Sequence, residues 1–279
     1  MNKGKLTKNI KQVFVALLCL AVVFLFILPF LWIFATSMRP SRESFALPPS
    51  FWPARLDFTN YRAVLNTIPF FHYAFNSMTI AVLSTLGMTL FTSMAAFGLS
   101  RLQLRFSGAI YSVFLAGMMV PASAMLVPVF TIIRSIGLLD SKWALILLGM
   151  YYPVGLLMMR QTMMTIPKSY DEAAYIDGAG SFRIYWQIIL PMSRSSVMVS
   201  AVMCFIASWN NFLQPLILLN STESYTLPLA MQFLKTSRGN TNMALVLAAV
   251  MLTLIPPLLI YIFAQKYLIQ GVLTSGLKA

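Results

Sequence analysis

The residue types best suited to a binding function lie in one polar segment, residues 168–191, which separates two long apolar runs. Within it, the carboxylate of Glu172 precedes a row of aromatic residues, and Pro191 closes the segment. Carboxylates beside aromatic and aliphatic side chains can bind a partner protein through ionic and apolar contacts together. The composition of residues 168–191 therefore indicates a segment that binds a partner protein.

The local pattern of this segment predicts two short helices. Ser169 is suited to an N-cap, and Glu172 three residues later completes an S-x-x-E capping box. Gly178 can end the first helix, because glycine accepts the left-handed conformation found after a C-cap. Ser181 is suited to cap the second helix, which Pro191 is expected to interrupt.

The second of these helices is predicted to have one apolar face. Phe182, Tyr185, Trp186 and Ile189 recur at the i, i+3, i+4 and i+7 spacing of an amphipathic helix. Two such helices joined by a glycine bend form a compact projection. It has two interpretations: a pair of helices lying on the membrane surface, or a plug for a groove on a soluble partner.

A second group of polar residues lies in the sequence WNNFLQP, residues 209–215. Asn210, Asn211 and Gln214 are uncharged amides, which both donate and accept hydrogen bonds and so suit hydroxyl-rich ligands. We predict that they line a translocation path. Hydrogen bonding between helices of a membrane bundle is an equally good interpretation.

The elements that position these residues are membrane-spanning helices. The chain has 279 residues, of which 59% are hydrophobic and 10% charged, whereas a soluble domain has about 25% charged residues. Its net charge of +13 does not indicate nucleic acid, because the basic residues lie at the ends of apolar runs. Cys19 and Cys204 lie inside such runs and His72 is the single histidine, so neither a disulfide nor a metal site is expected.

Six apolar runs predict an all-α membrane protein with six transmembrane helices. Runs this continuous differ from the alternating pattern of barrel strands. The helices are expected near residues 13–36, 73–98, 107–133, 143–164, 196–219 and 244–265, in a single transmembrane domain, 1–279. The two-helix loop, 168–191, then lies between the fourth and fifth helices.

The distribution of Lys and Arg predicts the orientation. Basic residues cluster at the N-terminus, as in Lys3 and Lys5, and a cytoplasmic N-terminus gives the better agreement with the positive-inside rule. An even number of helices then places the C-terminus and the loop 168–191 in the cytoplasm as well. The apolar run that follows the basic start is about twice as long as that of a signal peptide, so we expect a retained helix.

The six apolar runs, of which the fourth ends at residue 159, before Arg160, contain no Asp, Glu, Lys or Arg, and the chain has no G-x-x-x-x-G-K-[ST] phosphate loop. Ion-coupled carriers usually place an ionisable residue in the bilayer, and ATP hydrolysis needs a phosphate site. We therefore expect no catalytic residue, no cofactor and no enzymatic activity in this chain, with energy supplied by a partner.

The loop resembles the E-A-A-x(3)-G-x(9)-I-x-L-P signature of permease subunits of ATP-binding-cassette (ABC) importers. The matching residues are Glu172, Ala173, Ala174, Gly178, Ile188, Leu190 and Pro191, and Asp177 in IDGAG fits the carbohydrate branch. The sequences SWNNFLQPLILL, residues 208–219, and QKYLIQGVLTSGLKA, residues 265–279, extend the resemblance. The chain is most similar to the shorter permease of the maltose importer.

This resemblance implies a permease in the bacterial inner membrane that forms half of a path for a sugar or oligosaccharide. The implied partners are a second homologous permease, two ATPase subunits and an extracytoplasmic solute-binding protein, with the EAA loop 168–191 docking the ATPase. A polyamine or metal ion carried by the same mechanism is one alternative. The alternative from another class of protein is a structural subunit of a membrane assembly. Copurification with an ATPase distinguishes an importer permease from such a subunit.

Overall fold

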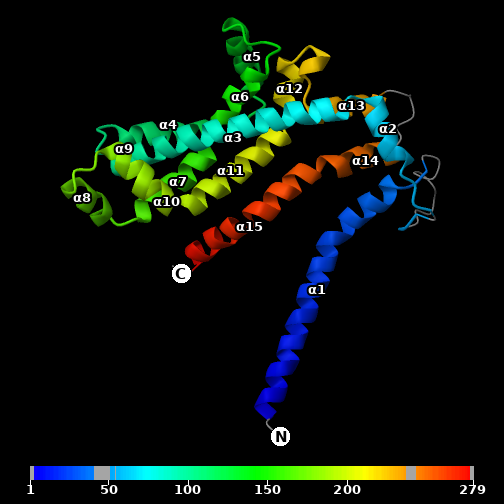
Figure 1. Cartoon of the computed structure of the whole chain (residues 1–279), viewed down its shortest axis with the longest axis horizontal. Helices are drawn as coiled ribbons and strands as arrows, with labels where there is room; N and C mark the ends of the chain where they lie inside the picture. Colours follow the sequence, from blue (N-terminus) through cyan, green and yellow to red (C-terminus); the bar gives the residue numbers. More distant parts are fainter. Residues whose placement is uncertain (1–2, 41–50, 54, 237–242, 277–279) are drawn as a thin grey trace. The chain divides into compact units, whose positions relative to one another are not determined.

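The computed structural model describes residues 3–40, 51–53, 55–236 and 243–276. These residues form helices, joined by turns, and no strand (Figure 1). The longer helices, in chain order, are α1 (Lys3–Ser37), α2 (Thr59–Thr67), α3 (Phe70–Arg101), α4 (Ser107–Met119), α5 (Leu126–Ser135), α6 (Lys142–Met150), α7 (Pro153–Thr165), α8 (Ser169–Ile176), α11 (Arg194–Trp209), α13 (Leu227–Thr236), α14 (Met243–Thr253) and α15 (Ile255–Gly276). The shorter ones are α9 (Ser181–Ile184), the π-helix η2 (Tyr185–Ile189), α10 (Leu190–Met192), α12 (Leu213–Leu218) and the 3₁₀ turn η3 (Thr222–Ser224).

Four stretches of the described chain are long and apolar enough to cross a bilayer. They are Lys11–Ser37, Phe70–Arg101, Lys142–Thr165 and Met243–Tyr267. The last four predicted helices, 107–133, 143–164, 196–219 and 244–265, are each divided, into α4 and α5, α6 and α7, α11 and α12, and α14 and α15. The all-helical class is confirmed, and the count of six spans stays a prediction.

The divisions have local causes. Pro121 follows the end of α4, Pro153 is the first residue of α7, and Pro256 lies in the first turn of α15. Proline has no N–H to donate and fits the first turn of a helix, so it favours a new helix start over continuation. Pro215 likewise lies in the first turn of α12, directly after the division at residues 210–212.

Contacts between residues group the chain into two compact units. The first unit comprises residues 1–69 and 231–254, in which α14 packs against both α1 and α2. The Asn60 side chain donates to the carbonyl oxygens of Ser37 and Arg39, at 2.9 and 2.7 Å, and so closes the C-terminal end of α1. Apolar side chains of α1 such as Phe24 and Phe26 are exposed, which suits contact with lipid.

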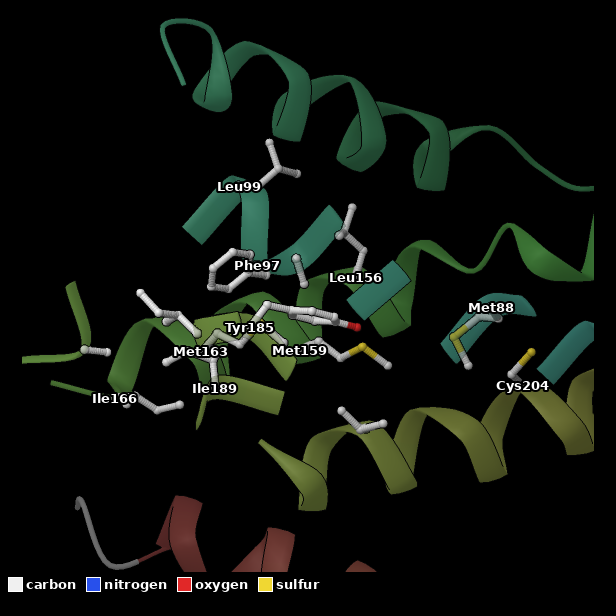
Figure 2. Packing of buried hydrophobic residues seen from close by; sticks show 14 residues of the cluster. Met88, Phe97, Leu99, Leu156, Met159, Met163, Ile166, Tyr185, Ile189 and Cys204 are labelled. Atoms are coloured by element: carbon white, nitrogen blue, oxygen red, sulfur yellow. The ribbon is translucent and has the colours of Figure 1, made fainter. Parts of the chain in front are cut away.

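The second unit comprises residues 70–230 and 255–279, and α3 is its central helix. It packs against α6, α7 and α11, and α11 also packs against α15. Small residues permit the close approach of α3 and α6: a Cβ added at Gly149 of α6 would lie 2.5 Å from Ser84 Oγ of α3. A buried cluster that includes Met159 and Met163, with Met88 and Cys204 at one side of it, fills the space between α3, α7, η2 and α11 (Figure 2).

The loop between α5 and α6 is held to the segment after α12. Asp140 has a left-handed backbone, φ 58°, and its N–H donates to the Leu218 carbonyl at 2.8 Å. Its carboxylate accepts from the N–H groups of Ser221 and Asn220, at 3.0 and 2.9 Å. These two donors, that of Ser221 first, hold the pKa of Asp140 below its usual value.

Candidate functional site

The segment predicted to carry the docking function forms α8, α9, η2 and α10. Its first helix does not have the predicted capping box. Lys168, which precedes α8, already has a helical backbone (φ −65°, ψ −22°) and no side chain caps the N-terminus. Pro167 lies before it, and the Tyr170 N–H donates to the Pro167 carbonyl at 3.4 Å. Ser169 and Glu172 therefore lie inside the helix, and the assignment of Ser169 as N-cap is wrong.

The glycine bend is confirmed. Gly178 has φ 78°, in the left-handed region, directly after the C-cap Asp177. The Gly178 N–H donates to the Tyr175 carbonyl at 3.0 Å, and the Ala179 N–H donates to that of Ala174 at 2.9 Å. These are the two hydrogen bonds of a Schellman motif, which satisfies the last carbonyl groups of α8.

The second helix begins one residue earlier than predicted. Gly180 is its N-cap, and Ser181 is its first residue, whose hydroxyl lies 3.0 Å from the Tyr175 hydroxyl. The N–H of Leu190 donates to Tyr185, five residues earlier, so this part is a π-helix. Pro191 follows at once. Because a proline ring collides with the carbonyl four residues before it, a wider turn at this point relieves the contact.

Pro191 was predicted to interrupt this helix. Instead the helix continues past Pro191 and ends at Ser193. There the direction of the chain changes by 79° between the segment Ser181–Met192 and α11. The Ser193 N–H still donates to the carbonyl of Ile189, at 3.0 Å. The loop is therefore a projection set at a steep angle to α11.

The apolar face of the second helix differs from the prediction. Tyr185 and Ile189 are buried as expected, but Phe182 and Trp186 are 68% and 54% exposed. Ile184 is buried in their place. The π-turn inserts one residue, so a face counted at 3.6 residues per turn does not continue through it.

The buried side of the loop is fixed to the transmembrane helices by Tyr185. Its hydroxyl lies 2.7 Å from Ser93 Oγ, and its ring centroid lies 5.4 Å from that of Phe97, both on α3. Figure 2 shows Tyr185 and Ile189 beside Met159 and Met163 of α7. The core of the second unit thus extends from α3 and α7 into the loop.

The signature residues divide between the two sides of this projection. Glu172, Ala173, Asp177, Gly178 and Pro191 are exposed, Ala174 is buried, and Ile188 and Leu190 are half-buried against the core. Beside the exposed carboxylates lies an exposed group of apolar and aromatic side chains: Tyr170, Tyr175, Ile176, Phe182 and Trp186. An exposed apolar surface with charged neighbours is typical of an interaction site.

One residue of this region was not predicted. Asp171 faces inward, and its Oδ2 lies 3.5 Å from Nη1 of Arg101, the last residue of α3. The sequence shows two adjacent acids, and neighbouring helical positions point about 100° apart. Nothing in the pattern indicates which of Asp171 and Glu172 has a buried cation as its partner.

A cavity of about 140 Å³ lies between α3, α6, α11 and α12, in the second unit. Its lining residues are Ile80, Leu145, Gly149, Tyr151, Tyr152, Cys204, Ala207, Ser208, Asn211, Pro215 and Thr226. Two helix interruptions, at 151–152 and 210–212, open onto it. Irregular backbone inside a membrane occurs where it lines such a cavity. Its lining is largely apolar, with hydroxyl groups, one amide and two aromatic rings among the apolar side chains and no charged side chain.

The three predicted amides occupy different environments. Asn211 lines the cavity, and its Nδ2 donates to Gln214 Oε1 at 2.6 Å. Asn210 is exposed and is not among the lining residues. The Asn211–Gln214 hydrogen bond is local, between the interruption and the first turn of α12, so it does not join separate transmembrane helices.

Several apolar helices, an uncharged cavity between them and a loop with exposed carboxylate and aromatic side chains are the features of a multi-pass membrane protein. Residues 89–274 match the family described as "binding-protein-dependent transport system inner membrane component", and the chain belongs to this family.

Sequence relatives agree with that family, and a solved structure has a similar fold. The arabinooligosaccharides transport system permease protein AraQ of Bacillus subtilis (strain 168) is 29% identical over 273 residues, 97% of each chain. The galactooligosaccharides transport system permease protein GanQ of the same organism is 30% identical over 281 residues, 98% of each chain. A crystal structure of a bacterial ABC transporter involved in alginate import has a similar fold, with a TM-score of 0.78, 22% identity and coverage of 94% of this chain and 97% of that one.

Proposed function

We propose that this chain is one of two permease subunits of an ABC importer for a sugar or oligosaccharide. The observation that carries the proposal is the exposed loop: its signature carboxylate Glu172 and the neighbouring aromatic side chains are accessible, while its other side is continuous with the core of the transmembrane helices. A partner that binds the exposed side can therefore move the transmembrane helices. Solute specificity and ATP hydrolysis then belong to different parts of the assembly.

The proposed arrangement has six transmembrane helices in one domain, 1–279, with both termini and the loop 168–191 in the cytoplasm of a bacterium. Two ATPase subunits bind the loops of this chain and of a homologous permease, and an extracytoplasmic binding protein delivers the solute. ATP binding and hydrolysis shift the permease pair between two states, because the ATPases make different contacts in each.

The cavity favours an uncharged, hydroxylated solute. Asn211, Ser208 and Thr226 supply amide and hydroxyl groups, and the rings of Tyr151 and Tyr152 lie beside them. A polyamine or a metal ion would require carboxylates, and the residues that line this cavity include none. The names of the relatives, which refer to arabino- and galactooligosaccharides, agree with this solute class.

Reconstitution tests the proposal directly. First, calorimetry of the binding protein with an oligosaccharide panel identifies a solute, which is then radiolabelled. Proteoliposomes with this chain alone are expected to accumulate none of it, under a pH gradient or with ATP. Proteoliposomes with both permeases, the ATPases and the loaded binding protein are expected to take it up only with hydrolysable ATP. Accumulation driven by the pH gradient would instead identify a secondary carrier.

A further inference from the structure

Arg101 joins three helix ends at the base of the loop. It is the last residue of α3, and its side chain is 3% exposed. Its Nη1 lies 3.5 Å from Asp171 Oδ2 in the first turn of α8, and its Nη2 donates to the carbonyl oxygen of Ile166, which follows α7, at 2.8 Å. One guanidinium group therefore binds the ends of α3 and α7 and the start of α8.

The helix ends place these charges favourably. A cation at the C-terminus of α3 and an anion at the N-terminus of α8 both agree with the helix dipoles. The Ile166 carbonyl is one of the groups that a helix leaves without an internal partner. The planar guanidinium can bond a carbonyl and a carboxylate at the same time, whereas a lysine ammonium is a single point of contact.

Helix α8 has few other attachments. Within the described chain it packs only sparsely on other helices. Of its residues Ala174 alone is buried, while Tyr170, Tyr175 and Ile176 are exposed. Asp171, which is 15% exposed, therefore provides the main polar link between α8 and the transmembrane helices.

The other end of α3 leads to the cavity. Ile80 of α3 lines the cavity, and at 1.5 Å per residue it lies about 30 Å along the helix from Arg101. The Arg160 Nε also donates to the Leu99 carbonyl, at 3.4 Å, so α7 is bound to the same end of α3. A displacement of this end can be carried by a rigid helix to the residues around the cavity.

We propose that Asp171 and Arg101 are positioning residues that make α8 move together with α3 and α7. The displacement of α8 by the ATPase is then transmitted to α3 at Arg101, in parallel with the path through Tyr185. This inference rests on the proposed function, since it assumes that an ATPase displaces the loop. It assigns a role to Asp171, which lies outside the signature, and leaves the exposed Glu172 to the partner.

The test measures solute uptake and ATP hydrolysis on the same proteoliposomes, with the complete importer. Asp171→Asn is nearly isosteric and keeps the Arg101–Ile166 hydrogen bond; Arg101→Gln removes the cation. In both variants, hydrolysis stimulated by the loaded binding protein is expected to stay within about twofold of wild type, while uptake per ATP falls about tenfold, because a buried charge has lost its partner. The double variant is expected to lose no more than Asp171→Asn alone, because the two residues act as a pair.

Arg105→Gln is the matched control, since Arg105 is exposed four residues after Arg101, and it is expected to keep the wild-type ratio. If the pair is purely structural, hydrolysis, uptake and assembly fall in proportion, and this result would overturn the proposal. Uptake per ATP equal to that of wild type in both single variants would overturn it as well. If neither single variant assembles, Arg101→Lys decides: an intermediate uptake per ATP supports the proposal, and a wild-type value contradicts it. ATP-dependent uptake by the wild type tests the proposed function separately from every one of these results.

Discussion

The substitution Gly178→Val tests the docking role of the loop through its backbone alone. The Gly178 backbone has φ 78°, and a Cβ added there meets no atom within 4 Å, so steric contact with neighbours does not contribute. A residue other than glycine in the left-handed region costs about 1–2 kcal/mol, and a β-branched one is strained further. If the bend relaxes instead, the Schellman hydrogen bonds of Gly178 and Ala179 are lost, at about 1 kcal/mol each.

Either outcome disfavours the docking conformation by about 1–2 kcal/mol, which predicts a Kd for the ATPase about 5- to 30-fold higher, since 1.4 kcal/mol corresponds to tenfold. The assay titrates purified ATPase against the permease pair in nanodiscs and measures Kd by biolayer interferometry. Gly178→Asn is expected to be intermediate, because asparagine tolerates the left-handed region better than valine does.

Gly180→Val is the matched control. It lies two residues later with φ −75° and ψ 162°, a conformation open to any residue, and a Cβ there also meets nothing within 4 Å. Its Kd is expected to equal that of wild type. Equal Kd values for Gly178→Val and wild type, at equal insertion, would refute the reasoning, and so would an equal loss in Gly180→Val.

Three further predictions concern orientation, charge and pH. A reporter fused at Ser181 should be cytoplasmic and one fused at Leu56 exported; an exported Ser181 fusion would contradict the orientation and the docking role together. Glu172→Lys should insert and fold as wild type, because the side chain is exposed and caps nothing, yet copurify less ATPase; normal copurification would remove Glu172 from the docking surface. The pKa of Asp140 is lowered from its ordinary value of 3.8, so the hydrogen bond from the Ser221 N–H to the Asp140 carboxylate is fully formed above pH 3.8. It should be lost as the pH falls through the lowered pKa and the carboxylate is protonated. Amide exchange at Ser221, corrected for intrinsic rates, should therefore rise only below pH 3.8, and a rise already at pH 5 would contradict this.

The parts of the fold that the sequence predicts correctly are those for which a single physical rule is sufficient. Long uncharged runs can only be helical in lipid, and a glycine after a short helix is the residue that accepts a left-handed backbone. The helices and the bend at Gly178 follow from these rules. The interruption at Asn210–Phe212 was not predicted, although Pro215 follows it, because a proline in a membrane helix can also be accommodated by a kink without a break.

Within the loop, two errors come from local backbone geometry and one from a tertiary contact. The capping box at Ser169 fails because the chain is already helical at Lys168. The predicted face does not continue through Trp186 because the π-helix Tyr185–Ile189 changes the period, while Phe182, which precedes it, is exposed on α9. The inward direction of Asp171 depends on Arg101, 70 residues earlier in the chain, and no local spacing reports that contact.

The π-helix η2 has a consequence for the exchange of parts between importers. Its turn contains one residue more than an α-helical turn, and it lies between the exposed aromatic side chains and α11. The rotation of the loop about its helix axis is therefore offset from the rotation of α11. A chimera that takes its loop from another permease can thus present that permease's surface without rotating α11. The junction for such a graft belongs after Ile189, near Ser193, where the chain already turns by 79°.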